Sequence, residues 1–227
     1  MKNFGFTLAE VLITLGVIGV VATMTIPVLL TKMEHNAKIA KLQKSIYIMN
    51  QAMRMSISEN GEYDGWDKLA PKPYVEKYFA PYLKIVMWCD TAKKCGYKET
   101  NPWASQKAYS VFNNVERVPF ITIDGILFSV ITSGGLATGD KDMDKLYDYS
   151  ESSRSGIIVD VNVSKNPNRY GNDLFFLVRT EKGTVMPLGY NLSDETIKSD
   201  CTKEHLRIYC AERLRRNGWK APQDYPW

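Results

Sequence analysis

Hydrophobic residues divide the chain into two unlike parts. From Phe6 to Leu30 the sequence is almost entirely apolar, and Glu10 is its one ionisable residue. As a helix this stretch would extend about 37 Å, enough to cross a hydrocarbon core roughly 30 Å thick. It is long for the apolar part of a secretory signal, and no small-residue cleavage site follows it. We therefore predict a membrane-spanning helix that stays with the mature protein.

The helix is expected to continue beyond the membrane to about Ser58. Apolar residues recur there in steps of three and four, the spacing of one face of an α-helix. These residues are Ile39, Leu42, Ile46, Met49 and Met53. The stripe they form is where a globular domain would pack. Asn60–Gly61 is predicted to end the helix.

The rest of the chain predicts mostly antiparallel strands. A second, shorter helix is expected over 74–87. Asp124–Gly125 separates two β-rich runs and predicts a hairpin over 119–132. Residues 181–183 predict another hairpin between the runs 174–180 and 184–189. Residues 156–163 are expected to form a further strand. The fold class is α+β: a long N-terminal helix packed on a small antiparallel β-sheet domain.

The sequence also predicts a long loop and a terminal helix in the second half of the chain. Residues 134–155 are polar and rich in turn-forming residues, so a long loop is predicted there. From Asp200 to Arg216 the pattern predicts a terminal helix, with Gly218 as its C-terminal stop. Beyond it lies a short tail rich in aromatic residues and proline.

Charge and motifs exclude several function classes. The formal net charge of +4 is spread along the chain. The densest basic run, 213–216, is too short to indicate nucleic acid, so no nucleic-acid partner is expected. There are only two histidines, and no P-loop, G-x-S-x-G or H-E-x-x-H motif occurs. We therefore expect no enzymatic activity.

The cysteines indicate an oxidising compartment. All four lie beyond residue 80, in two local pairs. They are Cys89, Cys95, Cys201 and Cys210. Disulfides are the preferred interpretation, although three connectivities are possible and free thiols are an alternative. Zinc fits less well, because C-x5-C and C-x8-C differ from the usual finger spacing. If Cys201 pairs with Cys210, the chain must fold back between them, since one helix would hold their Cα atoms about 13.5 Å apart.

Glu10 needs a partner. A carboxylate near one end of a bare transmembrane helix costs on the order of a few kcal/mol. Along the helix the next basic residue is Lys32, about 33 Å away. Lys2 is nearer but lies in the short polar leader. The counter-charge should therefore come from another molecule or from a new amino terminus.

The segment Gly5-Phe6-Thr7-Leu8-Ala9-Glu10-Val11, after a leader with Lys2, resembles the prepilin cleavage and N-methylation motif of type IV pilins and type II secretion pseudopilins. The resemblance implies cleavage after Gly5 by prepilin peptidase and methylation of the new amine on Phe6. It also implies that Glu10 pairs with the Phe6 amine of a neighbouring subunit. Pro27 matches an in-helix proline of the family, where the assembled helix is locally loosened.

The same resemblance implies a domain plan and a set of partners. Residues 1–5 are the leader, 6–30 the transmembrane and assembly helix, 31–60 its amphipathic half, and 61–227 an extracytoplasmic α+β domain. The expected partners are prepilin peptidase, other copies or sister pilins in a helical filament, an inner-membrane assembly platform and the lipid bilayer. The protein is expected in the bacterial inner membrane as a single-pass protein with its C-terminal domain in the periplasm or outside the cell. A simple positive-inside count of the lysines after the span favours the opposite orientation.

A pseudopilin of a type II secretion-like system is the favoured function, since the VDVN-to-GxD stretch from 159 to 173 resembles one in pseudopilin-like proteins. Alternatives are a pilus subunit, a minor or tip pilin with an adhesive or DNA-uptake role, and a membrane-anchored periplasmic protein without a filament role. The stretch is also rich in oxygen side chains, and major pseudopilins bind calcium in their C-terminal half. Asp160, Asn162, Asn168 and Asp173 are therefore candidate calcium ligands. A hydrogen-bonded turn rich in Asx residues is the simpler interpretation.

Overall fold

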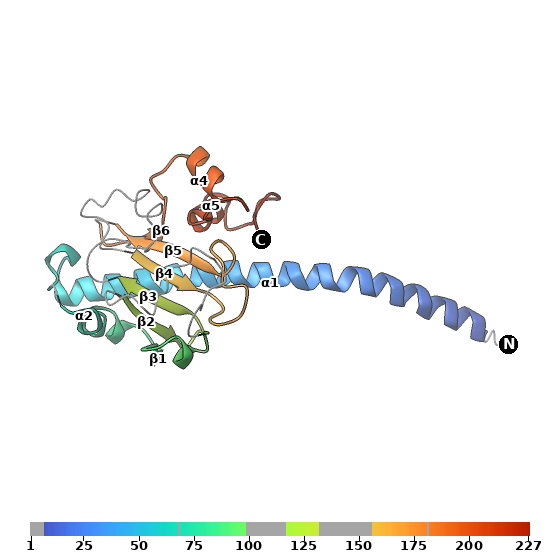
Figure 1. The fold of residues 1–227 in the computed structure, drawn as a ribbon, viewed down its shortest axis with the longest axis horizontal. Coiled ribbons are helices and arrows are strands. Elements are labelled where there is room, and N and C mark those ends of the chain that lie inside the picture. Colours follow the sequence, from blue (N-terminus) through green and yellow to red (C-terminus); the bar gives the residue numbers. More distant parts are fainter. Residues whose placement is uncertain (1–6, 68, 99–116, 132–155, 181) are drawn as a thin grey trace, which may run out of the picture. The chain divides into compact units, whose positions relative to one another are not determined.

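A computed structural model describes residues 7–67, 69–98, 117–131, 156–180 and 182–227 (Figure 1). The chain divides into two compact units, Met1–Ala37 and Lys38–Trp227. The helices are α1 (Leu8–Asn60), α2 (Pro71–Tyr78), α4 (Asp194–Asp200) and α5 (Cys210–Arg216), with short 3-10 turns η1 (Tyr63–Gly65), η2 (Ala80–Tyr82) and η3 (Lys93–Cys95). The strands are β1 (Ile85–Trp88), β2 (Arg117–Thr122), β3 (Leu127–Ile131), β4 (Gly156–Asp160), β5 (Leu174–Arg179) and β6 (Val185–Pro187).

The first unit contains the N-terminal part of α1. This part is long and apolar enough to cross a membrane, and its large apolar side chains are exposed. Pro27 lies inside the helix, and the Thr31 hydroxyl donates a hydrogen bond to the Pro27 carbonyl oxygen. The exposed apolar surface agrees with the predicted membrane anchor, since such side chains would lose their contact with water in a bilayer.

The second unit is built on one antiparallel sheet of six described strands in sequential order, β1-β2-β3-β4-β5-β6. Both predicted hairpins are present. Gly125 has a positive φ of 66° and donates its N–H to Thr122, which closes the turn between β2 and β3. A residue with a Cβ adopts this backbone conformation at a cost, so the turn favours glycine. β1 and β6 are the two edges of the described sheet.

Buried side chains cover both faces of this sheet. On one face, the part of α1 from Lys38 onward packs against the strands (Figure 1). The predicted stripe supplies this contact: Leu42, Met49 and Met53 are fully buried, Ile39 nearly so, and Ile46 is partly buried. The opposite face is covered by the segment around η3 and by residues next to α4 and α5. The expected fold class, a long helix on an antiparallel sheet in an α+β domain, is confirmed.

Two predicted boundaries were wrong. The helix expected over 74–87 begins at Pro71 and ends at Tyr78, and Ile85–Trp88 forms strand β1. Pro81 cannot donate a backbone hydrogen bond within a continuing helix, and β1 instead pairs with β2 at the sheet edge. The single terminal helix expected from Asp200 is also absent, because α4 ends at Asp200 and α5 starts at Cys210. The loop predicted at 134–155 lies outside the described residues.

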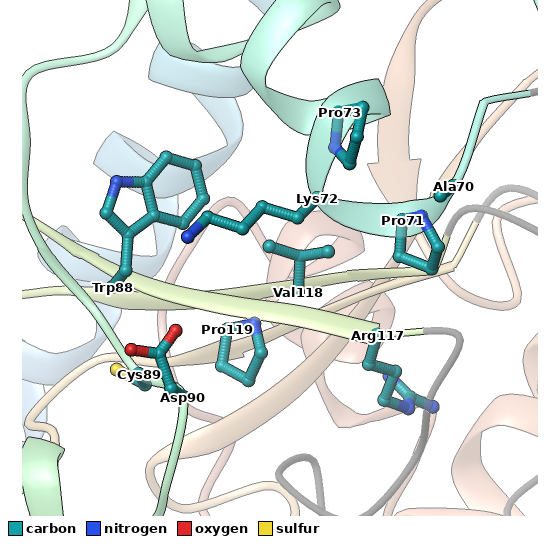
Figure 2. Close-up of a pocket in the computed structure, with 10 residues that line it drawn as sticks. All are labelled: Ala70, Pro71, Lys72, Pro73, Trp88, Cys89, Asp90, Arg117, Val118 and Pro119. Atoms are coloured by element: carbon teal, nitrogen blue, oxygen red, sulfur yellow. The ribbon is translucent and has the colours of Figure 1, made fainter.

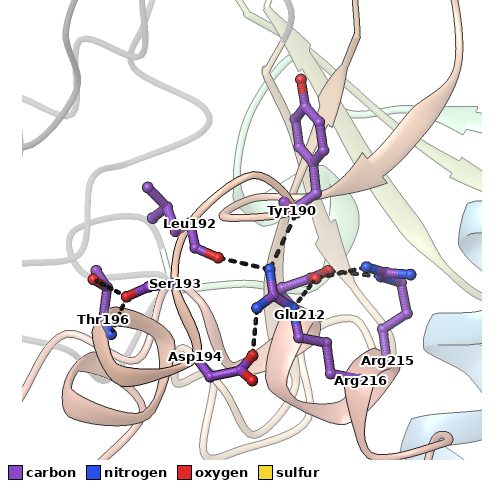
Figure 3. A network of polar contacts seen from close by, with 8 residues as sticks. All are labelled: Tyr190, Leu192, Ser193, Asp194, Thr196, Glu212, Arg215 and Arg216. Carbon is purple, nitrogen blue, oxygen red and sulfur yellow. Dashed lines mark hydrogen bonds and ion pairs between the residues drawn. The ribbon is translucent and has the colours of Figure 1, made fainter.

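A polar network joins α5 to the segment before α4 (Figure 3). Glu212 is completely buried, and Arg215 donates two hydrogen bonds of 2.7 Å to its carboxylate. Arg216 donates a third of 2.7 Å and also donates to the carbonyl oxygens of Tyr190 and Leu192 and to the Asp194 carboxylate. The buried charge of Glu212 is thus fully paired, as a buried carboxylate requires.

Candidate assembly site and buried aspartate pair

Glu10 forms a reciprocal cap with Thr7 at the start of α1. Both the backbone N–H and the hydroxyl of Thr7 donate to Glu10 Oε2 at 2.8 Å, and the Glu10 N–H donates to Thr7 Oγ1 at 3.3 Å. This arrangement is a capping box, in which Thr is the N-cap and Glu lies three residues later. The Thr-x-x-Glu spacing is a sequence signal for this cap, which reasoning from the charge of Glu10 alone misses. Within the described chain the carboxylate therefore has hydrogen-bond donors but no counter-charge.

The other assembly residues are placed only in part. Gly5 and Phe6 lie outside the described residues, so the cleavage and methylation predictions remain predictions. Pro27 lies within α1, as expected. Cleavage after Gly5 would leave Thr7 and Glu10 intact, because Thr7 would be the second residue of the mature chain.

Both local cysteine pairs form disulfides in the structure. Cys89 bonds to Cys95 with the Cα atoms 5.6 Å apart, and Cys201 bonds to Cys210 with a separation of 5.0 Å. The chain folds back between Cys201 and Cys210, which the geometry of pairing required. Gly171 packs against this bond: a Cβ there would lie 2.8 Å from Cys210 Sγ, and its φ is 74°. Both constraints favour glycine at this position.

The four candidate calcium ligands lie together at the end of β4 and in the loop that follows it. Asp160 accepts hydrogen bonds from the Tyr97 hydroxyl at 2.6 Å and from the Asn162 N–H at 3.0 Å. Asp173 accepts from the N–H groups of Asn168 and Arg169 and from the Asn162 side chain. Both aspartates are fully buried. No sequence pattern indicates that Tyr97 belongs to this cluster.

Burial sets the electrostatics of this aspartate pair. It raises the pKa of Asp160 well above the usual range, and hydrogen bonds from Tyr97 and Asn162 oppose this only in part. It also raises the pKa of Asp173, against the opposing hydrogen bond from the Arg169 backbone and the positive charge of Lys38. The negative charge of Asp173 further raises the pKa of Asp160.

These residues fit a hydrogen-bonded turn better than a calcium site. Each of the four carboxylate oxygens of Asp160 and Asp173 accepts a hydrogen bond from the protein. Asn162 Oδ1 is buried and makes no hydrogen bond within the described part of the chain. No group of three or more His, Cys, Asp or Glu residues suited to a metal occurs among the described residues. A cation that needs six to eight oxygens would have to share these carboxylates with their hydrogen-bond donors and find further ligands, so we prefer the hydrogen-bonded turn.

Three polar side chains of α1 attach this helix to the sheet domain. Asn50 exchanges two hydrogen bonds of 2.8 Å with the backbone of Val185 in β6, donating to its carbonyl and accepting from its N–H. Lys44 pairs with Asp124 in the β2–β3 turn, and Lys38 donates to Asn172 beside the buried aspartates. These contacts fix the direction and rotation of the helix from Lys38 onward relative to the sheet.

Comparison with known proteins agrees with the N-terminal geometry. Residues 1–26 match the family model described as the prokaryotic N-terminal methylation motif, which is the type IV pilin and pseudopilin signal motif. No curated protein and no solved structure gave a significant match. The match includes Gly5, the capping box of Glu10 and most of the apolar helix. The chain therefore carries at its N-terminus the signal motif of type IV pilins and pseudopilins.

Proposed function

We propose that this protein is a structural subunit of a type IV pilus-like filament, and specifically a pseudopilin of a type II secretion-like system. The observation that carries the proposal is the methylation motif of residues 1–26 at the start of an apolar helix. Prepilin peptidase would cut after Gly5 and methylate the Phe6 amine. The apolar part of α1 would hold the subunit in the inner membrane and later pack against the helices of neighbouring subunits.

The electrostatics of Glu10 support assembly as the purpose of this segment. The N–H and hydroxyl groups of Thr7 donate hydrogen bonds to the Glu10 carboxylate, but both groups are neutral. The Glu10 carboxylate would lose its hydration on moving from water into an apolar helix bundle. An opposite charge at short range can compensate for this loss. The amine that cleavage creates on Phe6 of an adjacent subunit would be this opposite charge.

Other features support an extracytoplasmic place for the globular domain. Both disulfides bridge residues of the second unit. Disulfides persist in oxidising compartments such as the bacterial periplasm and are rare in the cytosol. This supports translocation of the domain despite the lysines that follow the span, because long domains translocate largely regardless of charge.

Intact mass of the protein purified from its native membrane tests the processing step. We expect the mature chain to lack residues 1–5 and to carry one additional methyl group on Phe6. A Gly5→Val chain should stay uncleaved and fail to assemble. A functional assembly whose subunits still begin at Met1 would refute the proposal, because the counter-charge for Glu10 would then be missing.

Three variants separate charge pairing from helix capping. Glutamine also serves at the third position of a capping box, so Glu10→Gln preserves the cap and removes only the charge. Thr7→Ala removes the two hydrogen bonds of the Thr7 hydroxyl and keeps the charge. Glu10→Ala removes the charge and both hydrogen bonds to the carboxylate. If charge pairing drives assembly, both Glu10 variants insert normally but form few filaments, and Thr7→Ala assembles. Normal assembly of Glu10→Gln together with failure of Thr7→Ala would show that capping alone matters.

The choice of secretion over a pilus role rests on the resemblance of the stretch 159–173 to pseudopilin-like proteins. Deletion of the gene should leave the secreted proteins of the system in the periplasm and leave surface pili unchanged. Loss of pili or of DNA uptake with normal secretion would instead favour a pilin or a competence subunit.

A further inference from the structure

A pocket opens between the start of α2, the end of β1 and the start of β2 (Figure 2). Its walls are mainly apolar and include Pro71, Pro73, Val118, Pro119 and the ring of Trp88. Proline rings fix the local backbone, so these walls have little freedom to collapse. The pocket is therefore largely preformed, which lowers the entropic cost of holding a ligand.

The Trp88 wall is held from two sides. Its ring packs edge-on against Phe120, with the centroids 5.6 Å apart. The following residue, Cys89, also lines the pocket and is tied to Cys95 by a disulfide. The indole face turned to the pocket is thus a fixed apolar plane suited to stacking with another flat group.

Lys72 brings a positive charge to this plane. Figure 2 shows its side chain extending across the pocket toward Trp88, and Nζ lies 5.6 Å from the ring centroid. Lys72 forms no ion pair with any residue that the structure describes. The carboxylate of Asp90 at the pocket edge is bonded to Lys94 at 2.7 Å. The charge of Lys72 contributes to the lowered pKa of Asp90 after the larger effect of Lys94, but its ammonium N–H groups can still donate to an external anion.

The residues that line the pocket also indicate which kind of ligand would carry this anion. Pro71 and Pro73 have no N–H, so the first turn of α2 offers few of the backbone donors that usually bind anions at helix N-termini. The guanidinium nitrogens of Arg117 are buried, so Lys72 must provide the charge recognition. Apart from Lys72, the polar lining consists of Asp90 and Arg117. A sugar would lose the hydration of many hydroxyls here without finding partners, which is unfavourable.

We propose that this pocket binds a peptide carboxylate that lies next to an aromatic ring. The ring stacks on Trp88 between the proline walls, and the carboxylate pairs with Lys72. A ligand of this size on an exposed site is held weakly, with a dissociation constant on the order of 1 mM. If the proposed filament forms, repeated copies of the pocket along it would bind a partner with several such groups through avidity.

The test compares N-acetyl-phenylalanine with its uncharged amide, titrated into the full chain in detergent and followed by saturation-transfer NMR. We expect the carboxylate to bind about three- to fivefold more tightly than the amide, the range of an exposed charge pair. Lys72→Ala should abolish this difference, and high salt should reduce it. Lys84→Ala is the matched control, because this exposed lysine precedes β1 and does not line the pocket.

The ring is tested separately with N-acetyl-alanine, which should not bind measurably. Trp88→Leu should weaken both phenylalanine probes, and near-UV circular dichroism verifies that this variant is folded. Equal affinity for the acid and the amide, an unchanged preference in Lys72→Ala, or no binding of either probe would overturn the proposal. Processing and filament assembly should be normal in Lys72→Ala. A failure of the filament proposal can therefore be distinguished from a failure of the binding proposal.

Discussion

Substitution of Asn50 should destabilise the domain far more than its position on a helix surface suggests. Its side chain donates to the Val185 carbonyl and accepts from the Val185 N–H, both at 2.8 Å. It thereby occupies the place that a further strand would take beside β6. The amide also donates to the Ile46 carbonyl at 2.9 Å, which holds it in this orientation.

The expected loss of stability follows from the backbone groups of Val185 that would lose their hydrogen-bond partners. In Asn50→Ala, the backbone N–H and carbonyl of Val185 lose their partners, and the Val185 side chain is fully buried. Each buried polar group without a partner costs about 1–3 kcal/mol. Because water can reach this edge in part, we expect a total of about 2–4 kcal/mol. At roughly 2–4 °C per kcal/mol for a chain of this size, the midpoint of unfolding should fall by about 5–12 °C.

The assay must report on the sheet domain. Far-UV circular dichroism would be dominated by α1, whose apolar part remains helical in detergent. Tryptophan fluorescence and near-UV circular dichroism of the full chain during thermal unfolding are therefore preferable. Gln51→Ala is the control, since Gln51 is an exposed neighbour on the same helix and should change stability by less than about 0.5 kcal/mol. Equal midpoints for the two variants would refute the role assigned to Asn50.

Three other measurements test the buried polar groups. The raised pKa of Asp160 means that this carboxyl binds a proton more tightly in the folded state than in the unfolded state. The contribution of Asp160 to the free energy of unfolding should therefore fall as the pH rises above about 4. Asp160→Asn should make the free energy of unfolding depend less on pH. Glu212→Gln should cost about 1–3 kcal/mol in urea unfolding because two arginines lose their carboxylate, whereas Glu195→Gln at an exposed site should be neutral. Calcium should not raise the unfolding midpoint, since the carboxylate oxygens of Asp160 and Asp173 already accept hydrogen bonds; a rise that Asp173→Asn abolishes would show a calcium site.

Local patterns in the sequence predicted those parts of the fold that local physics determines. The stripe on α1 identified the buried helix face, and Asp124–Gly125 located a hairpin turn. Strand β1 was misassigned because its partner β2 lies some thirty residues later, and a short apolar run does not itself distinguish strand from helix. The separate α4 was missed although Ser193 is a favourable N-cap and accepts the Thr196 N–H at 3.2 Å.

In the candidate site, too, local contacts were predictable from the sequence and long-range contacts were not. The Thr7–Glu10 cap has a recognisable spacing, so the sequence contained the signal even though we had interpreted Glu10 only through its charge. Clustering of Asp160 with Asp173 was predictable as a polar turn. The contact of Asp160 with Tyr97 joins residues sixty-three positions apart, and that of Asn50 with Val185 joins residues 135 apart. Such contacts depend on how the sheet is assembled, and no local pattern encodes them.

The family model matches residues 1–26, which is the part of the chain on which the proposed function places the most conditions. Under the proposed function this segment must be cut by a peptidase, cross the membrane without charged residues other than one acid, and pair that acid only after cleavage. Few sequences do so. The sheet domain has to bury its two faces and hold α1 through contacts such as that of Asn50 with Val185. Many sequences of similar volume and pattern fulfil these conditions. Under the proposed function, the N-terminus would therefore determine that the subunit assembles, and the surface of the domain, including the Trp88 pocket, would determine what the filament contacts.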